Sequence, residues 1–154
     1  MRDSRTEYIT TNAIIAALYV CLTAISPLSY GVVNIRFADI IPVVGCLDKR
    51  YRIGVTVGLI IANMLSPYGI IDVACAVLYS ASIYVGWIAT QRAARVAIYV
   101  LSESMIVALE ICMIEKIPFL IMAAEMLITQ SVLSIVGIAI YDTIMSRIGK
   151  NNDG

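Results

Sequence analysis

The stretch Thr10–Leu28, TTNAIIAALYVCLTAISPL, carries no charged side chain. About 20 residues of helix cross the hydrocarbon core of a bilayer, so this run is long enough to span it. It ends at Ser26-Pro27, with Tyr30-Gly31 just beyond, and a proline cannot continue a helix without losing a backbone hydrogen bond. The stretch therefore predicts a transmembrane helix and decides how the rest of the chain is interpreted.

The composition of the whole chain agrees with a membrane location. Of its 154 residues, 60% are hydrophobic and 14% are charged, whereas soluble domains are near half apolar and a quarter charged. The net charge is zero and there is no polybasic run, which argues against a nucleic-acid partner. We predict an all-α integral membrane protein with a single transmembrane domain over residues 1–154.

Five further apolar segments follow the first, and turn-forming or charged residues separate them. The segment at 35–47 is short and contains Pro42, so it is expected to be kinked or to span only part of the bilayer. The segment at 53–66 is also short. The predicted fold is a six-transmembrane-helix bundle with approximate spans 10–28, 35–47, 53–66, 70–90, 94–114 and 118–145.

The basic residues predict the orientation of this bundle. With six spans and both termini in the cytoplasm, nine of the eleven Lys and Arg residues fall on the inner side, as the positive-inside rule requires. The bias supports two crossings by the short segments at 35–47 and 53–66, and it predicts a multi-pass protein of the cytoplasmic membrane. The inner residues are Arg2, Arg5, Lys49, Arg50, Arg52, Arg92, Arg95, Arg147 and Lys150; the outer ones are Arg36 and Lys116.

Polar side chains inside the apolar segments are the candidate functional residues, because intramembrane charges are costly and usually paired or functional. The predicted topology places them mainly in the outer half, which indicates a pocket open to the outside. A location at the water interface remains open for Asp72, Glu110 and Lys116, and so does a local ion pair of Arg36 with Asp39. The set is Asn34, Arg36, Asp39, Asn63, Asp72, Glu103, Glu110, Glu125 and Gln130.

Two pairs of small residues have the four-residue spacing that lets helices approach closely. They are Ala13 with Ala17 and Gly54 with Gly58. Internal helix packing is the default interpretation of either pair.

Signs of enzymatic chemistry are absent from the sequence. There is no histidine, the four cysteines lie singly in apolar runs, and no phosphate loop or Gly-x-Ser-x-Gly motif occurs. We therefore expect no catalytic residues, no metal and no cofactor.

Several ordered blocks resemble the QueT family of substrate-binding (S) components of energy-coupling factor (ECF) transporters. They are AALYVCLT at 16–23, PLSYG at 27–31, RFAD at 36–39, IANMLSP at 61–67 and GIIDV at 69–73. The chain departs from the family pattern at Asp39, where a Glu is expected, and at Ala76, where a Gly is expected.

The resemblance implies a six-helix S component that captures 7-deazaguanine queuosine precursors. Its partners would be a transmembrane coupling subunit and two ATPase subunits, with Ala13 and Ala17 as the docking face for the coupling subunit. Two alternatives remain open: a stand-alone secondary transporter in which Glu103 and Glu125 relay protons, and a structural membrane protein without a ligand.

The ligand chemistry suggests roles for the polar residues. A carboxylate can accept two adjacent N–H groups of a 7-deazaguanine, and a cationic or amide donor can serve its carbonyl. Asp72 is the first choice for the carboxylate, followed by Asp39 and then Glu125, and the loop 27–34 is expected to be a gate. The predicted binding set is Tyr30, stacking on the base, with Asn34, Arg36, Asp39, Asn63, Asp72, Glu103 and Glu125.

Overall fold

The computed structural model describes residues 4–25 and 36–152, and within them the chain forms helices and no strand. The proline and glycine breaks of the sequence separate these helices. In chain order they are α1 (Ser4–Ile25), the short 3-10 helix η1 (Phe37–Ile40), α2 (Pro42–Leu47), the 3-10 helix η2 (Lys49–Tyr51), α3 (Arg52–Met64), α4 (Ile70–Gly86), α5 (Arg92–Glu115) and α6 (Phe119–Asn152). The predicted six-helix, all-α class is confirmed.

Three of these helices are long and apolar enough to cross a membrane: α1, α5, and α6 as far as Arg147. The other apolar helices are shorter, and α3 has 13 residues. Such a helix extends about 20 Å at about 1.5 Å per residue, which is less than the hydrocarbon core of about 30 Å. The number of crossings therefore stays a prediction. The longest helix, α6, continues past the predicted end at Met145.

The segment predicted at 35–47 differs most from its expected form. It is broken at Ile41-Pro42 into η1 and α2, because proline starts a helix more readily than it continues one. The α2 side chains are almost all buried, and α2 packs against α3, α4, α5 and α6. Its apolar character thus comes from a position at the centre of the bundle rather than from contact with lipid.

Two glycines allow α1 to lie directly on α3. A Cβ atom at Gly54 would lie 2.4 Å from the carbonyl oxygen of Asn12, and one at Gly58 would lie 3.1 Å from Cα of Ala16. Asn12 strengthens the contact by accepting a hydrogen bond from the Gly54 N–H at 2.7 Å and donating to the carbonyl of Arg50 at 2.9 Å. The Gly54–Gly58 pair therefore serves internal packing.

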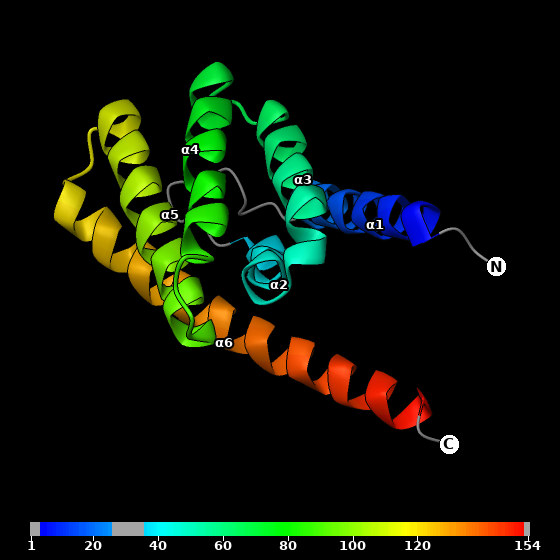
Figure 1. The fold of residues 1–154 in the computed structure, drawn as a ribbon. Coiled ribbons are helices and arrows are strands. Elements are labelled where there is room, and N and C mark those ends of the chain that lie inside the picture. Colours follow the sequence, from blue (N-terminus) through cyan, green and yellow to red (C-terminus); the bar gives the residue numbers. More distant parts are fainter. Residues whose placement is uncertain (1–3, 26–35, 153–154) are drawn as a thin grey trace.

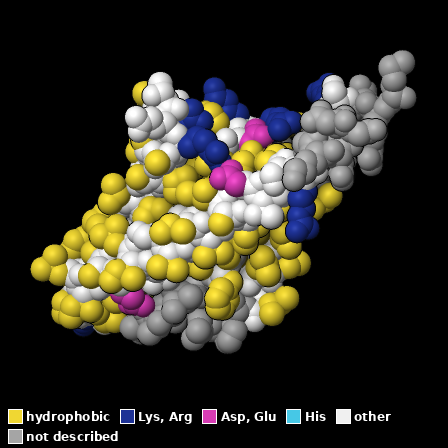
Figure 2. Space-filling view, turned by 90° about the horizontal axis from the view of Figure 1, so that it is seen from below, with side chains coloured by type: hydrophobic (Ala, Val, Ile, Leu, Met, Phe, Trp, Pro, Cys, Tyr) yellow, Lys and Arg dark blue, Asp and Glu magenta, His cyan; other side chains and the backbone are white. Residues whose placement is uncertain are grey.

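The arrangement has two distinct ends. Helices α3, α4 and α5 stand side by side, and α6 runs obliquely to them and packs against α5 and α2 (Figure 1). One end carries the α3–α4 and α5–α6 connections, where Gly69 has φ of +65° and Lys116 is left-handed. The other end carries η2 and the α4–α5 connection, together with most of the basic side chains. Figure 2 shows these gathered in one region beside an otherwise largely hydrophobic face.

Candidate functional site

Asp39 lies at the centre of the bundle, where three elements meet. Its side chain is buried, and its two carboxylate oxygens accept hydrogen bonds from different helices. Tyr19 of α1 donates to Oδ1 at 2.8 Å, and Gln130 of α6 donates to Oδ2 at 2.8 Å. These contacts satisfy the carboxylate inside the protein, so Asp39 joins α1, η1 and α6.

Arg36 is buried just before η1 and points toward α3 and α4. Its Nη1 donates to Oδ1 of Asn63 at 3.0 Å, and its Nη2 lies 4.0 Å from Oδ2 of Asp72. The Asn63 amide in turn contacts the carbonyl of Leu59 at 2.8 Å and the hydroxyl of Tyr79 at 3.0 Å. The structure thus shows an ion pair between Arg36 and Asp72 of α4. It does not show the local pair with Asp39 that the sequence left open.

Glu103 adds a third acidic group from α5. It is buried and lies within electrostatic range of Asp39 and Arg36. Its Oε2 has no hydrogen-bond partner among residues 4–25 and 36–152, and the same holds for the Tyr99 hydroxyl one turn away. Unsatisfied buried polar atoms are rare in native proteins, and these two groups are close enough to partner each other as well as a polar ligand.

We call this assembly the polar cluster. It brings acidic and donor groups together inside an apolar bundle, and the acids outnumber the single cation. Its members are Tyr19, Arg36, Asp39, Asn63, Asp72, Tyr79, Tyr99, Glu103 and Gln130.

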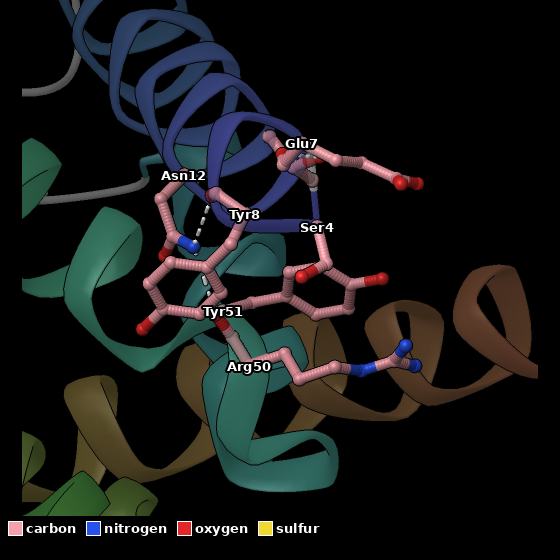
Figure 3. Close-up of a pocket in the computed structure, with 7 residues that line it drawn as sticks. Ser4, Glu7, Tyr8, Asn12, Arg50 and Tyr51 are labelled. Carbon is pink, nitrogen blue, oxygen red and sulfur yellow. Dashed lines mark hydrogen bonds between the residues drawn. The ribbon is translucent and has the colours of Figure 1, made fainter. Parts of the chain in front are cut away.

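A polar groove on the surface lies away from the polar cluster. It has a volume of about 280 Å³, lies between the start of α1 and η2, and is lined by Ser4, Glu7, Tyr8, Thr11, Asn12, Arg50 and Tyr51. Figure 3 shows its polar groups, of which Asn12 is engaged in the α1–α3 contact. Arg50 is held by Asp48 at 2.7 Å. This groove is open at the basic end and is separate from the polar cluster.

Comparison with known proteins relates most of the chain to one family. The QueT transporter family model matches residues 9–146. The chain belongs to the QueT transporter family.

A curated relative agrees with this assignment. The queuosine precursor transporter QueT of Lactococcus lactis subsp. cremoris (strain MG1363) is 42% identical over 69 residues, which cover 43% of this chain and 41% of the relative. The match thus spans about two fifths of that relative's length. No solved structure matches the chain. The resemblance to the QueT family is confirmed, and the apolar helices of a member of this family make the chain a multi-pass membrane protein.

The polar cluster contains five of the predicted binding residues. They come from the segment before η1, from η1 itself and from α3, α4 and α5, and they are Arg36, Asp39, Asn63, Asp72 and Glu103. Asp72 and Glu110 are buried within the protein, whereas Lys116 is exposed.

Of the other three predicted binding residues, one lies outside the polar cluster and two lie outside the described residues. Glu125 is partly exposed on α6, and the structure shows no hydrogen bond from it to the polar cluster within the described ranges. Tyr30 and Asn34, and with them the proposed gate at 27–34, lie outside the described residues. The predicted docking residues Ala13 and Ala17 are exposed on α1, and Ala13 borders the groove between α1 and α3.

Sequence reasoning missed the three tyrosines of the cluster. Tyr19, Tyr79 and Tyr99 resemble ordinary core residues in an apolar helix, and no local pattern distinguishes them. Gln130 is visible as a polar residue in the last apolar segment, but its partner Asp39 is 91 residues away. Among the described residues no group of three His, Cys, Asp or Glu side chains is placed to hold a metal ion.

Proposed function

We propose that this chain is the membrane subunit that captures a queuosine precursor, a 7-deazaguanine base, for import. Two findings support the proposal: membership in the QueT transporter family, and the name of the Lactococcus lactis relative. The observation that carries it is the polar cluster, a set of buried acids and hydrogen-bond donors inside a protein whose outer surface is apolar.

The charge balance of the cluster favours a ligand that brings hydrogen-bond donors. Asp39, Asp72 and Glu103 are set against Arg36 as the cation. A 7-deazaguanine offers a ring N–H and an exocyclic amine side by side, which one carboxylate can accept together. An aminomethyl-bearing precursor would also supply a positive charge to a second carboxylate.

Asp72 is the best candidate for the pairing carboxylate. Both oxygens of Asp39 already accept hydrogen bonds from Tyr19 and Gln130. By contrast, Oδ2 of Asp72 is buried and accepts no hydrogen bond from the described residues. Arg36 lies next to it and is the candidate donor to the carbonyl of the base. Asn63 is a weaker candidate, because its amide nitrogen already donates to Leu59 and Tyr79. Glu103, Glu125, Tyr30 and Asn34 remain secondary candidates.

Transport would be driven by partner proteins rather than by this chain. The proposed partners are an ECF transmembrane coupling subunit and two ATPase subunits, with Ala13 and Ala17 as the docking face on α1. Their exposure supports this role, because small side chains on a lipid-facing helix allow another helix to approach closely. The proposed location is the cytoplasmic membrane with both termini inside, and the chain itself would not be an enzyme.

Calorimetry on the purified protein tests the recognition step. Guanine, the cyano- and aminomethyl-bearing precursors, and a purine lacking the exocyclic amine are titrated into the parent and into Asp72→Asn, Asp39→Asn and Glu125→Gln. Leaving a buried donor unpaired costs on the order of 1–3 kcal/mol, so Asp72→Asn should weaken precursor binding by at least about tenfold. If all three variants bind the precursors as tightly as the parent does, the proposed recognition by a carboxylate is wrong. The same holds if the amine-free purine binds as tightly as the precursors.

Uptake assays separate ECF-type coupling from the stand-alone alternative. The chain is expressed alone and then together with coupling and ATPase subunits. Import that requires the ATPases supports the proposal, whereas proton-dependent import by the chain alone would favour a secondary transporter using Glu103 and Glu125.

A further inference from the structure

Two grooves meet where α1 and α3 begin. One is the polar groove of about 280 Å³ between α1 and η2, and the other is an apolar groove of about 230 Å³ between α1 and α3. Tyr8 and Asn12 line both of them, so the two grooves adjoin. Together they form one site with a polar part and an apolar part, which we call the amphipathic groove.

The close packing of α1 on α3 creates the apolar part. Gly54 has no side chain and Ala16 has a short one, so the two helices meet through their backbones and leave a hollow beside the contact. The hollow extends from Tyr8 to Ala16, which is about 12 Å along α1 at about 1.5 Å per residue. The apolar side chains of Ile9, Ile53 and Val57 are exposed around it.

The polar part has an acid on one wall and a base on the other. Glu7 comes from α1, and its carboxylate has no ion pair within residues 4–25 and 36–152. Arg50 comes from η2, and Asp48 accepts hydrogen bonds from its Nε and Nη2. A guanidinium has five N–H donors, so Arg50 can also donate to a phosphate oxygen. In Figure 3 the Glu7 and Arg50 side chains both extend away from the helices that carry them.

The neighbouring cations are engaged on other surfaces. Lys49 lies over the ring of Trp87 and Arg52 over the ring of Tyr84, each 4.9 Å from the ring centroid. Neither cation lines the polar groove. The groove therefore has the acid Glu7 beside an arginine whose charge Asp48 balances, and this combination favours a zwitterionic headgroup over an anionic one.

We propose that the amphipathic groove binds one phospholipid with an ethanolamine headgroup. The ammonium group donates to Glu7, the phosphate accepts from Arg50, and an acyl chain lies in the apolar part. The direction of the groove fits a lipid, because its polar part lies at the basic end, where α1 and α3 both begin, and its apolar part follows the two helices away from that end. The proposal goes beyond the function proposed above, since it requires only a membrane location.

Native mass spectrometry of the full-length protein in detergent tests the headgroup. The protein is delipidated and titrated with phosphatidylethanolamine, phosphatidylcholine and phosphatidylglycerol that carry identical acyl chains. The ethanolamine lipid should bind most tightly, because a choline group has no N–H donor and a glycerol headgroup leaves the lipid anionic. Glu7→Gln should lose about threefold in affinity for this lipid, as for an exposed ion pair, and Glu115→Gln, at the other end of the molecule, is the control. Equal binding of the three lipids by the parent, or an unchanged preference in Glu7→Gln, overturns the proposal.

A variant that fills the apolar part tests the acyl chain. Val57→Trp should weaken binding of the ethanolamine lipid about tenfold, because its ring takes the place of the chain. Val85→Trp, at an exposed position of α4, is the matched control and should bind as the parent does. Unchanged binding by Val57→Trp overturns the proposal. Free phosphoethanolamine should not displace the lipid, because it has no acyl chain; displacement would identify a site for soluble phosphate esters and overturn the lipid assignment.

A helix of a partner protein is the alternative occupant of the apolar part, because Ala13 borders it. A pull-down of the coupling subunit with Val57→Trp separates the two. Loss of the lipid from the isolated variant supports the proposal. If the variant keeps the lipid but loses the coupling subunit, the groove is the partner's interface and the proposal is wrong.

Discussion

The polar cluster and the basic end of this protein use charged residues in opposite ways. In the polar cluster, charges are buried and bonded to side chains from other helices, as Asp39 is to Tyr19 and Gln130. At the basic end, cations lie over aromatic rings near the surface: Arg95 is 3.7 Å and Lys49 is 4.9 Å from the ring centroid of Trp87.

The difference shows why residue type alone does not mark a binding site. An exposed Arg or Lys keeps most of its hydration, and a ring contact there contributes only about 0.5–1 kcal/mol. A buried charge has lost its water and depends on the partners that the fold provides. The basic end therefore fits an interfacial anchor, and the polar cluster fits a site for a polar ligand.

Asp48 illustrates the solvated behaviour at the basic end. Burial alone would raise its pKa, but hydrogen bonds from the Arg50 side chain and backbone, together with the charge of Arg50, lower the pKa below its ordinary value. A lowered pKa in the folded state means that the contact stabilises the fold at neutral pH. This contribution is lost as the pH falls through that pKa. Because Asp48 lies near the surface, the effect is small.

The largest effect is expected from Arg36→Met in the polar cluster. The variant leaves Asp72 and the Asn63 oxygen buried without their cationic partner, and removing one member of a buried pair costs about 3–5 kcal/mol. Thermal unfolding in detergent should show a large loss of stability. Arg52→Met, which removes a cation stacked on Tyr84 at the basic end, is the control. An equal loss in both variants would contradict the difference between the polar cluster and the basic end.

The next effect concerns the α1–α3 contact that holds Tyr19 against Asp39. In Gly54→Ala the new Cβ would meet backbone atoms of Asn12, and such overpacking costs about 1–3 kcal/mol. Gly58→Ala should cost less, because its nearest contact is 3.1 Å rather than 2.4 Å. Unfolding midpoints of the two variants measure the order, and a larger loss in Gly58→Ala would contradict the close approach seen at Gly54.

A smaller effect is expected from Trp87→Phe at the basic end. The variant loses the hydrogen bond from the indole N–H to the carbonyl of Gly45, 3.2 Å long, but keeps an aromatic ring for Arg95 and Lys49. One neutral hydrogen bond contributes about 0.5–1.5 kcal/mol. The unfolding midpoint should fall slightly while precursor binding is unchanged. Weakened binding would show that the basic end and the polar cluster are coupled.

The smallest effect on the isolated protein is expected from Ala17→Trp. Its side chain is exposed on α1, so stability and ligand binding should stay near those of the parent. A pull-down with the coupling subunit should nevertheless fail, because a bulky side chain keeps the two helices apart. Leu18→Trp, at the next exposed position, should keep the complex. Retained docking in Ala17→Trp with lost ligand binding would assign this face to internal packing.

The sequence by itself determined the environment of the chain and the places where its helices stop. Lipid offers no hydrogen-bond partners to the backbone N–H and C=O groups of a long uncharged run such as Thr10–Ile25. These groups must therefore bond to one another within the run, which a helix allows. The break at Ser66–Gly69 follows from local chemistry as well: Pro67 cannot continue α3, and Gly69 tolerates its φ of +65°. The ordered blocks between residues 16 and 73 were also sufficient to indicate the QueT family.

Only the tertiary structure decided which polar residues meet and which apolar segment lies inside. Tyr19 is 20 residues and Gln130 is 91 residues from Asp39, so no local spacing relates them. Likewise, α2 looks like a short membrane span in the sequence but lies buried among four helices. Lipid and protein interior are equally apolar solvents, so a hydrophobic run cannot distinguish them. The other helices pack around Pro42–Leu47, and this packing places the segment in the protein interior rather than in lipid.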